Sequence, residues 1–310
     1  MNMAAGNTGI YAKLTLVAIV WGASFIAGRV VAAEMDAVTA ALWRYIVAAT
    51  TLVAVALVVE HGLPRLTAKQ WFGVVVLGIL GVAIYNLCFM YGLQTVPASR
   101  ASLIIALNPA ATLVGGALFL HEPLTRGRVI GIALALIGVA VELSGGNPLN
   151  LFARGSLQGE LAMFGCVVSW AAYTLLGKRM LGEGVSSLAA TTYAALAGTL
   201  LLVAINAATG NLHLPQASSK AWWCIAFIGV FSTALAYVWF YDGVRAIGPA
   251  RTAVFINLVP VVAIVLGVLL LGEKLVPSMV LGAALVVSGV FIINRAPAVS
   301  ATPHMQCHTG

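Results

Sequence analysis

Charged side chains are scarce in this sequence. Aspartate, glutamate, lysine and arginine make up 8% of the 310 residues, whereas 61% are hydrophobic and the mean hydropathy is +1.03. A soluble domain has too little core to hide so much apolar surface, so a soluble protein is excluded. Alternating segments of about ten residues, which membrane-spanning strands would need, are also lacking. The sequence therefore predicts an all-α integral membrane protein.

The patterns of common catalytic and metal sites are absent as well. There is no HExxH, no acidic cluster and no Gly-Lys-Ser/Thr phosphate loop, which a membrane enzyme acting on lipid-linked substrates could use. Three of the four cysteines, Cys88, Cys166 and Cys224, fall within apolar runs, where cysteine is usually a small buried hydrophobe. We predict no catalytic residue, no metal site, no cofactor and no disulfide framework, and we do not expect an enzyme.

Ten apolar runs of about 18–25 residues are separated by short polar breaks, and each is long enough for a helix to cross a bilayer. The first run lacks a clear cleavage site, so it is predicted as a span and not as a signal peptide. The tail, residues 296–310, is rich in Pro, Ala, Ser and Thr and is predicted to be disordered. The predicted spans are 11–32, 37–59, 69–94, 98–120, 126–144, 157–179, 186–208, 221–245, 249–271 and 276–294.

The formal net charge of +7 does not indicate nucleic-acid binding, because the positive residues are spread singly or in pairs over the loops. With the N-terminus inside, ten of them fall on the inner side and five on the outer side. By the positive-inside rule, this predicts a multi-pass protein of the inner (plasma) membrane with both termini in the cytoplasm. The inner set is Lys13, Arg65, Lys69, Arg126, Arg128, Lys178, Arg179, Arg245, Arg251 and Arg295, and the outer set is Arg29, Arg100, Arg154, Lys220 and Lys274.

The chain also repeats itself. Tryptophan, arginine, proline and glutamate recur at a shift of 151 residues, and Trp21 matches Trp170 at a shift of 149. We predict two five-helix repeats, residues 1–147 and 148–295. Because five is odd, the second repeat is inverted relative to the first, an architecture typical of secondary transporters that work by alternating access. The pairs at the longer shift are Trp71/Trp222, Arg100/Arg251, Pro109/Pro260 and Glu122/Glu273.

At these positions the chain resembles the EamA type of the drug/metabolite transporter (DMT) superfamily. The resemblance rests on WGASF at 21–25, on Arg44, on NPAATLVGGALFLHEPLT at 108–125 and on its degenerate copy LVPVVAIVLGVLLLGEKLV at 258–276. It extends from about residue 11 to residue 294 and implies two five-helix units that export amino acids, other metabolites or drugs. In general character the chain is similar to the YddG type of bacterial exporter, which handles aromatic amino acids.

Two matched helix faces near mid-membrane are the first candidates for a substrate site. Trp21, Ser24 and Phe25 share one face of their helix, and Trp170 and Tyr173 repeat that arrangement in the sixth span. Aromatic rings provide contact area and a hydroxyl a directed hydrogen bond, which suits a substrate with an apolar body and polar ends. The alternative is that the rings pack against neighbouring helices and the hydroxyl bonds its own backbone.

A second matched face lies on the third and eighth spans. Asn86 and Phe89 fall on one stripe of the third span, and Tyr237 falls on the matching stripe of the eighth. An amide in hydrocarbon needs a partner or a wet cavity, so Asn86 is expected either to join helices or to line the substrate path. Tyr85 lies off the stripe and is expected to pack or to anchor at the interface.

Ionisable residues within spans are expensive and often mark functional sites. Arg44 lies about two turns into the second span. It is expected to bind a substrate carboxylate, to pair with Glu34 or Asp36, or to snorkel to the outer interface. Arg100, near the start of the fourth span, is expected to anchor at the surface.

Asn108 and Pro109 interrupt the apolar run of the fourth span. A proline removes a backbone donor and crowds the preceding turn, so Pro109 predicts a kink, and Pro260 predicts the same kink in the ninth span. We predict both prolines as hinge residues. Asn108 has no counterpart in register and Asn257 lies almost one turn from the matching position, so this asymmetry makes the two asparagines candidates for substrate selection.

Acidic residues and glycines near the span ends are predicted to be structural. Glu122 and Glu273 are expected to cap the helix that follows each of them. Gly131 and Gly138 recur as Gly282 and Gly289, which predicts close packing of the fifth and tenth spans away from the transport path, or a dimer contact.

No acidic residue is expected at the midplane, where a proton-driven exporter of cations would need one. We therefore predict facilitative export of neutral or zwitterionic metabolites, above all aromatic or other apolar amino acids. The alternatives are export of cationic drugs, a sugar or a nucleoside and, remotely, a non-transporting scaffold or sensor. The expected partners are a small-molecule substrate and the lipid bilayer, with no nucleic acid, and the protein is a monomer or a homodimer.

Overall fold

A computed structural model describes residues 3–121, 124–147, 156–180, 185–247, 252 and 255–295. The described residues form helices and connecting turns, with no strand among them. In chain order the helices are α1 (Met3–Glu34), α2 (Ala37–Val59), α3 (Ala68–Leu77), the π-helix η1 (Gly78–Ile84), α4 (Tyr85–Thr95), α5 (Ala98–Ile105), α6 (Asn108–Leu120), α7 (Arg126–Ser144), α8 (Leu157–Met180), α9 (Ser187–Ala208), α10 (Ser219–Phe227), the π-helix η3 (Ile228–Leu235), α11 (Ala236–Ile247), α13 (Leu258–Leu271) and α14 (Pro277–Arg295).

The helices match the predicted spans. In the described part of the chain, nine helical stretches are long and apolar enough to cross a membrane, and Leu258–Leu271 is a shorter apolar helix. Two stretches, Ala68–Thr95 and Ser219–Phe240, continue through a π-helical turn. The prediction of an all-α integral membrane protein is confirmed. The predicted repeat boundary near 148 and the tail 296–310 lie outside the described residues.

Polar side chains in the sequence breaks begin several helices. Asp36 accepts hydrogen bonds from the backbone N–H groups of Val38 and Thr39, at 3.1 and 3.0 Å, and so caps α2. Thr67 and Gln70 form a reciprocal capping box at the start of α3. These caps satisfy N–H groups that lipid could not, so the polar breaks fix where the spans begin.

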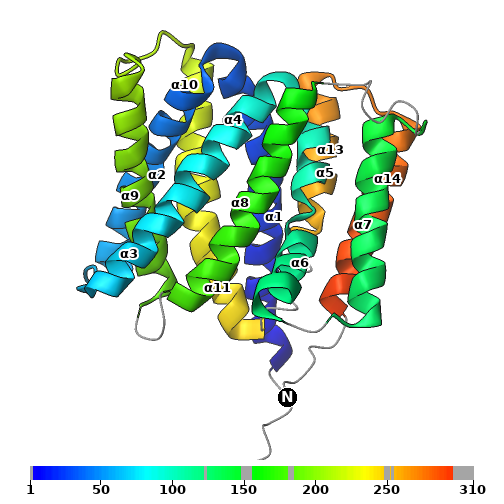
Figure 1. Ribbon diagram of the computed structural model, residues 1–310, viewed down its shortest axis with the longest axis horizontal. Coiled ribbons are helices and arrows are strands. Elements are labelled where there is room, and N and C mark those ends of the chain that lie inside the picture. The colour runs from blue at the N-terminus through cyan, green and yellow to red at the C-terminus, as the bar shows by residue number, and fades with distance from the viewer. Residues whose placement is uncertain are drawn as a thin grey trace, which may run out of the picture.

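The helices run up and down through the bundle, and both ends of the described chain lie at the same end of it (Figure 1). We call the end that carries Met3 and Arg295 the terminus side. The opposite end, which carries Glu34, Ser144 and Glu273, is the far side.

The helices α7 and α14 lie side by side at one edge of the bundle (Figure 1). Gly131 faces Gly289, and Gly138 faces Gly282. A Cβ atom on Gly138 would lie 2.7 Å from the carbonyl oxygen of Gly282, which is closer than any real contact of that kind. The predicted close approach of these two helices is therefore present, and it depends on the missing side chains.

The fourth span is broken in its middle. The helix α5 ends at Ile105, residues 106–107 form a turn, and α6 begins at Asn108. Pro109 therefore stands in the first turn of α6, where its missing N–H leaves no helical hydrogen bond unmade. The predicted interruption of this span at Pro109 is therefore present, and it takes the form of a turn between two helices.

The ninth span has a related construction. The helix α13 begins directly after Asn257, so Pro260 also stands in a first turn. Both prolines thus mark a new helix start in mid-bundle. Their role as hinges stays a prediction.

Candidate substrate cavity

The helices surround a cavity of about 900 Å³, a size typical of small-molecule sites. Its walls begin in mid-bundle at Ser24 and Asn257 and continue to the terminus-side ends of α7, α9 and α14, at Arg128, Ser187 and Asn294. Among the described residues, no lining residue lies at a far-side helix end. Arg128 of α7 and several residues of α14 contribute to the wall, so the expectation that these helices stand away from the path does not hold if this cavity is the substrate path.

The cavity brings together nearly all the residues that the sequence singled out. That they bind a substrate stays a prediction, but they share one surface although they lie far apart in the chain. Those that line the cavity are Trp21, Ser24, Phe25, Arg44, Phe89, Asn108, Trp170, Tyr173, Tyr237 and Asn257, together with Pro109 and Pro260.

Asn86 is the exception. It is fully buried and does not belong to the cavity wall. Its amide nitrogen donates to the carbonyl oxygens of Val82 at 2.8 Å and Gly81 at 3.4 Å. Both carbonyls belong to the π-helix η1, and that of Val82 also accepts a hydrogen bond from the backbone N–H of Tyr85. In this structure Asn86 therefore stabilises that turn, and we correct its assignment to the substrate surface.

Aromatic rings form a continuous belt across the middle of the cavity, which we call the aromatic belt. The ring centre of Trp21 lies 5.9 Å from that of Tyr237, and Tyr237 lies 6.5 Å from Trp170. Trp170 lies 5.7 Å from Tyr85, which stacks on Phe89 at 6.1 Å. The belt spans helices from both ends of the chain. Tyr85 packs against its neighbours, as one of the two expectations for it stated, and it also lines the cavity.

The polar groups beside Trp21 are bonded to backbone. The indole Nε1 of Trp21 donates to the carbonyl oxygen of Ser232 in η3 at 2.9 Å, so Trp21 presents its ring and not its N–H. Ser24 donates its hydroxyl to the carbonyl oxygen of Trp21 at 2.6 Å. The hydroxyl thus bonds its own helix, as the structural alternative predicted, and its oxygen can still accept a hydrogen bond from a ligand.

Arg44 is buried in the cavity wall with 8% of its surface exposed. Its guanidinium carbon lies 5.3 Å from the ring centre of Phe89 and 5.8 Å from that of Tyr45. Within the described part of the chain, neither its Nε nor its Nη1 has a hydrogen-bond partner. The aromatic rings hold the cation in place without neutralising it.

The acids that were expected to pair with Arg44 are occupied elsewhere. Glu34 accepts hydrogen bonds from the backbone N–H and the hydroxyl of Ser218, at 2.7 and 2.8 Å. Asp36 caps α2. The burial of Arg44 also excludes snorkelling to the interface. Neither structural alternative for Arg44 is present, and its charge faces the cavity.

The charge of the cavity wall has one sign. The described lining residues include two charged side chains, Arg44 and Arg128, and no aspartate or glutamate. Asn108 and Asn257 add a buried Oδ1 and a buried Nδ2, each without a partner among the described residues. Arg128 was missed in the sequence, because an arginine in the first turn of a helix is usually a loop-side charge. The wall can attract an anionic group of a ligand, and its polar atoms can form hydrogen bonds with other groups of the same ligand.

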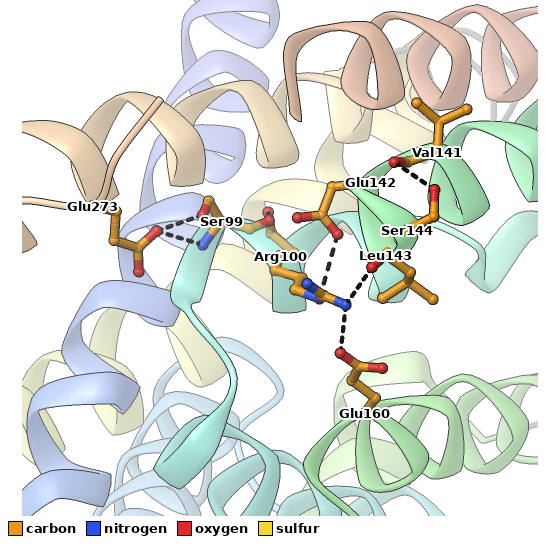
Figure 2. Close-up of polar contacts among 9 residues, drawn as sticks. Ser99, Arg100, Val141, Glu142, Leu143, Ser144, Glu160 and Glu273 are labelled. Carbon is orange, nitrogen blue, oxygen red and sulfur yellow. Dashed lines mark hydrogen bonds and ion pairs between the residues drawn. The ribbon is translucent and has the colours of Figure 1, made fainter. Parts of the chain in front are cut away.

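The far side is closed by a buried ionic network (Figure 2). The Nη2 atom of Arg100 lies 2.5 Å from the Oε1 of Glu160 and donates to the carbonyl oxygen of Leu143 at 3.0 Å, while its Nε lies 3.5 Å from the Oε2 of Glu142. The network joins α5, α7 and α8. The side chain of Arg100 is 12% exposed, so the prediction of a surface anchor is wrong.

Glu273 extends this far-side closure in an unexpected way. Its carboxylate accepts hydrogen bonds from the N–H groups of Ala98 and Ser99, at 2.7 and 3.1 Å, and from the Ser99 hydroxyl (Figure 2). It therefore caps α5 and not the helix that follows it, which corrects the prediction. The positive end of α5 explains the choice, since a carboxylate is stabilised there whichever segment supplies it. Glu122 and Arg251 lie outside the described residues.

A membrane-spanning helical bundle whose central cavity reaches one side and stops short of the other is the construction of a membrane transporter. The sequence model of the EamA-like transporter family matches residues 9–143 and 157–295. The chain therefore belongs to the EamA-like transporter family, of the DMT superfamily, as the resemblance predicted.

Similar proteins extend over the same length. The uncharacterized transporter YyaM of Bacillus subtilis (strain 168) is 30% identical over 285 residues, which cover 92% of this chain and 93% of YyaM. A probable terminal-alkyne amino-acid exporter of Streptantibioticus cattleyicolor is 29% identical, with 91% of this chain and 92% of that protein covered. A solved crystal structure that is 19% identical superposes with a TM-score of 0.63 over 92% of this chain and 96% of its own, which supports the fold.

Proposed function

We propose that this transporter exports small neutral or zwitterionic metabolites, most of all amino acids with an aromatic or other apolar side chain. The observation that carries the proposal is the guanidinium of Arg44, whose Nε and Nη1 have no partner among the described residues, beside the aromatic belt in one cavity. The guanidinium suits a carboxylate, and the aromatic belt suits an apolar side chain. An amino acid joins these two groups within a few bonds.

The charge of Arg44 supports a carboxylate ligand. A buried cation without a partner is costly, and a bidentate carboxylate would satisfy it with two charge-assisted hydrogen bonds. The Nε and Nη1 without partners lie on different edges of the guanidinium, and each edge also includes Nη2, so a bidentate carboxylate would use Nη2 together with one of them. The substrate would thus supply the counter-charge that the described wall lacks.

Other residues of the cavity wall could bind the side chain and the ammonium group of an amino acid. Ring faces such as those of Trp21 and Trp170 bind an apolar side chain and tolerate an ammonium group. The Oδ1 of Asn108 can accept a hydrogen bond from that ammonium group. The name of the Streptantibioticus cattleyicolor relative, an amino-acid exporter, supports the same substrate class.

Cationic drugs are the alternative that the wall favours least. A cation would meet two arginines and no carboxylate among the described lining residues. A sugar or a nucleoside would use the aromatic belt but would leave Arg44 unpaired. Transport by facilitated diffusion follows from the same lack of an acidic proton carrier in the described wall.

Alternating access by two inverted repeats, residues 1–147 and 148–295, completes the proposal. The cavity would then open to the cytoplasm if both termini are cytoplasmic, and the far side would face outward. Bending at the helix starts that contain Pro109 and Pro260 would serve as the hinge.

The test is counterflow in liposomes. Purified protein is reconstituted with unlabelled substrate inside, and the accumulation of labelled amino acids, sugars, nucleosides and cationic drugs is compared. We expect accumulation of aromatic or apolar amino acids that persists when a pH gradient is collapsed at unchanged substrate gradient. Exchange of cationic drugs alone would overturn the substrate class, and loss of transport on collapse of the pH gradient would overturn the facilitative mechanism.

A further inference from the structure

Arg128 holds a second cationic position in the same cavity, far from Arg44 along the wall. It is the third residue of α7 and lines the cavity where α7 begins, on the terminus side. Its Nε is buried and has no hydrogen-bond partner within the described residues. Its backbone N–H bonds the hydroxyl of Thr125, so the helix start is capped without any use of the guanidinium.

Fold stability does not account for this arginine. A cation in the first turn meets the positive end of the helix dipole, which is unfavourable. The acidic residue of its own helix, Glu142, lies at the opposite end of α7 and pairs with Arg100. Glu273 caps α5 on the far side. No described carboxylate is paired with Arg128, so its partly buried position has no structural gain that we can identify.

A second unpaired donor lies on the neighbouring helix. Asn294, at the terminus-side end of α14, lines the same part of the cavity, and its buried Nδ2 has no partner among the described residues. The helices α7 and α14 run side by side through their glycine contacts. Ser187 of α9 also lines the cavity with its hydroxyl, whereas the hydroxyl of Thr191 already donates to the carbonyl oxygen of Ser187 at 2.8 Å. This mouth therefore presents a guanidinium, an amide N–H and the Ser187 hydroxyl, which are groups that bind a carboxylate.

We propose that Arg128 and Asn294 form a second carboxylate site at the terminus-side mouth, which captures the substrate before Arg44 holds it. The proposal rests on the proposed function, because it assigns the same amino-acid carboxylate to both sites. The substrate enters near Arg128, and its carboxylate then passes to Arg44 along a wall whose described residues include no acid. Capture at the mouth raises the local concentration of substrate before the aromatic belt is reached.

Two consequences distinguish capture from a structural role. Removing Arg128 should raise the half-saturation concentration for substrate presented on the terminus side and leave that of the far side unchanged. The attraction is also electrostatic and partly solvent-exposed, so it should weaken as ionic strength rises. A mere loss of folded protein would change neither the sidedness nor the salt dependence.

The experiment compares Arg128→Gln with Arg126→Gln in full-length protein. Arg126 is exposed, lies two residues away and does not line the cavity, so the control removes the same charge from the same turn. Exchange of a labelled aromatic amino acid is measured from each side of sealed membrane vesicles, whose orientation is assigned by protease access to a C-terminal tag. We expect Arg128→Gln to raise the terminus-side KM about tenfold, equivalent to about 1.4 kcal/mol, and to remove its salt dependence. Arg126→Gln should behave as the wild type.

Several outcomes would overturn the second site. One is equal behaviour of the two variants, and another is an equal KM increase from both sides. An effect seen only in liposomes that contain anionic lipid would assign Arg128 to a phosphate head group. If Arg128→Gln does not fold, the salt dependence of KM is measured on both sides of the wild-type protein. The proposal is contradicted if the terminus-side KM is no more sensitive to salt than the far-side KM. A wild type that exchanges no amino acid would instead contradict the proposed function.

Discussion

The guanidinium of Arg100 lies 2.5 Å from the carboxylate of Glu160 and joins α5 to α8 at the end of the bundle that the cavity does not reach. The repeat places Arg251, Ile293 and Tyr11 at the positions that correspond to Arg100, Glu142 and Glu160. The terminus side therefore lacks both carboxylates of this network. Under the proposed alternating access, the same interaction could not close the terminus side, although the two predicted repeats correspond in sequence.

Glu160→Gln should loosen the far-side closure, because it removes the shorter of the two ion pairs of Arg100. The probe is Ile105→Cys, at a half-buried cavity-lining residue of α5, in a background without the four native cysteines. We expect a membrane-impermeant maleimide to label it from the terminus side alone when Glu160 is intact. With Glu160→Gln it should label from both sides. Unchanged one-sided labelling would contradict a role of the ion pair in closure.

Arg100→Gln should destabilise the protein more than any loss of a surface charge. It leaves two buried carboxylates without their cation, and breaking a buried pair in this way costs about 3–5 kcal/mol. Thermal unfolding in detergent measures the effect, with exposed Arg126→Gln as the control. Equal melting temperatures for the two variants would mean that the network contributes nothing to the fold.

Arg44→Gln should reduce transport without lowering the stability of the protein. Loss of charge-assisted hydrogen bonds to a carboxylate, worth about 1.5–3 kcal/mol, should reduce amino-acid counterflow about tenfold or more. The melting temperature should stay the same or rise, because the variant removes a buried charge that has no partner among the described residues. The measurements are counterflow and thermal unfolding of the same preparation. A marked loss of stability with transport retained would reveal a structural role instead.

Trp21→Ala and Trp170→Ala should reduce exchange while the protein stays folded. Each removes a ring of the aromatic belt, and we expect about tenfold weaker exchange of aromatic substrates. Trp223→Ala is the control, because that ring is 76% exposed on the outside of the bundle. Exchange by both belt variants at the rate of the control would show that the belt serves packing only.

Gly138→Ala should destabilise the pair of helices α7 and α14. The new Cβ would lie 2.7 Å from the carbonyl oxygen of Gly282, so the helices must separate, at a cost of about 1–3 kcal/mol. Gly9→Ala is the matched control, since no atom lies within 4 Å of its added Cβ. Thermal unfolding distinguishes the two. Equal melting temperatures would show that the contact relaxes freely.

Properties that depend on local sequence were predicted well. Apolar runs of bilayer length specify the spans, because a helix is the structure that satisfies its own backbone in lipid. Asp36 begins a helix through contacts with the next three residues, so its role needs no tertiary information. The facing glycines of α7 and α14 were visible through the repeat. The gathering of Trp21, Trp170 and Tyr237 on one surface followed from their helix faces.

The partners of charged and polar side chains were decided by tertiary structure alone. Arg44 lost its expected partners because Glu34 bonds Ser218, 184 residues away in the chain. Glu273 caps α5 because folding brings that helix start beside it, and the sequence shows no sign of a contact between residues so far apart. Asn86 donates to carbonyl oxygens of the π-helix η1, an irregular turn that hydrophobic periodicity does not reveal. Composition and periodicity determined which segments cross the membrane, whereas the long-range contacts decided where the unneutralised charge remains.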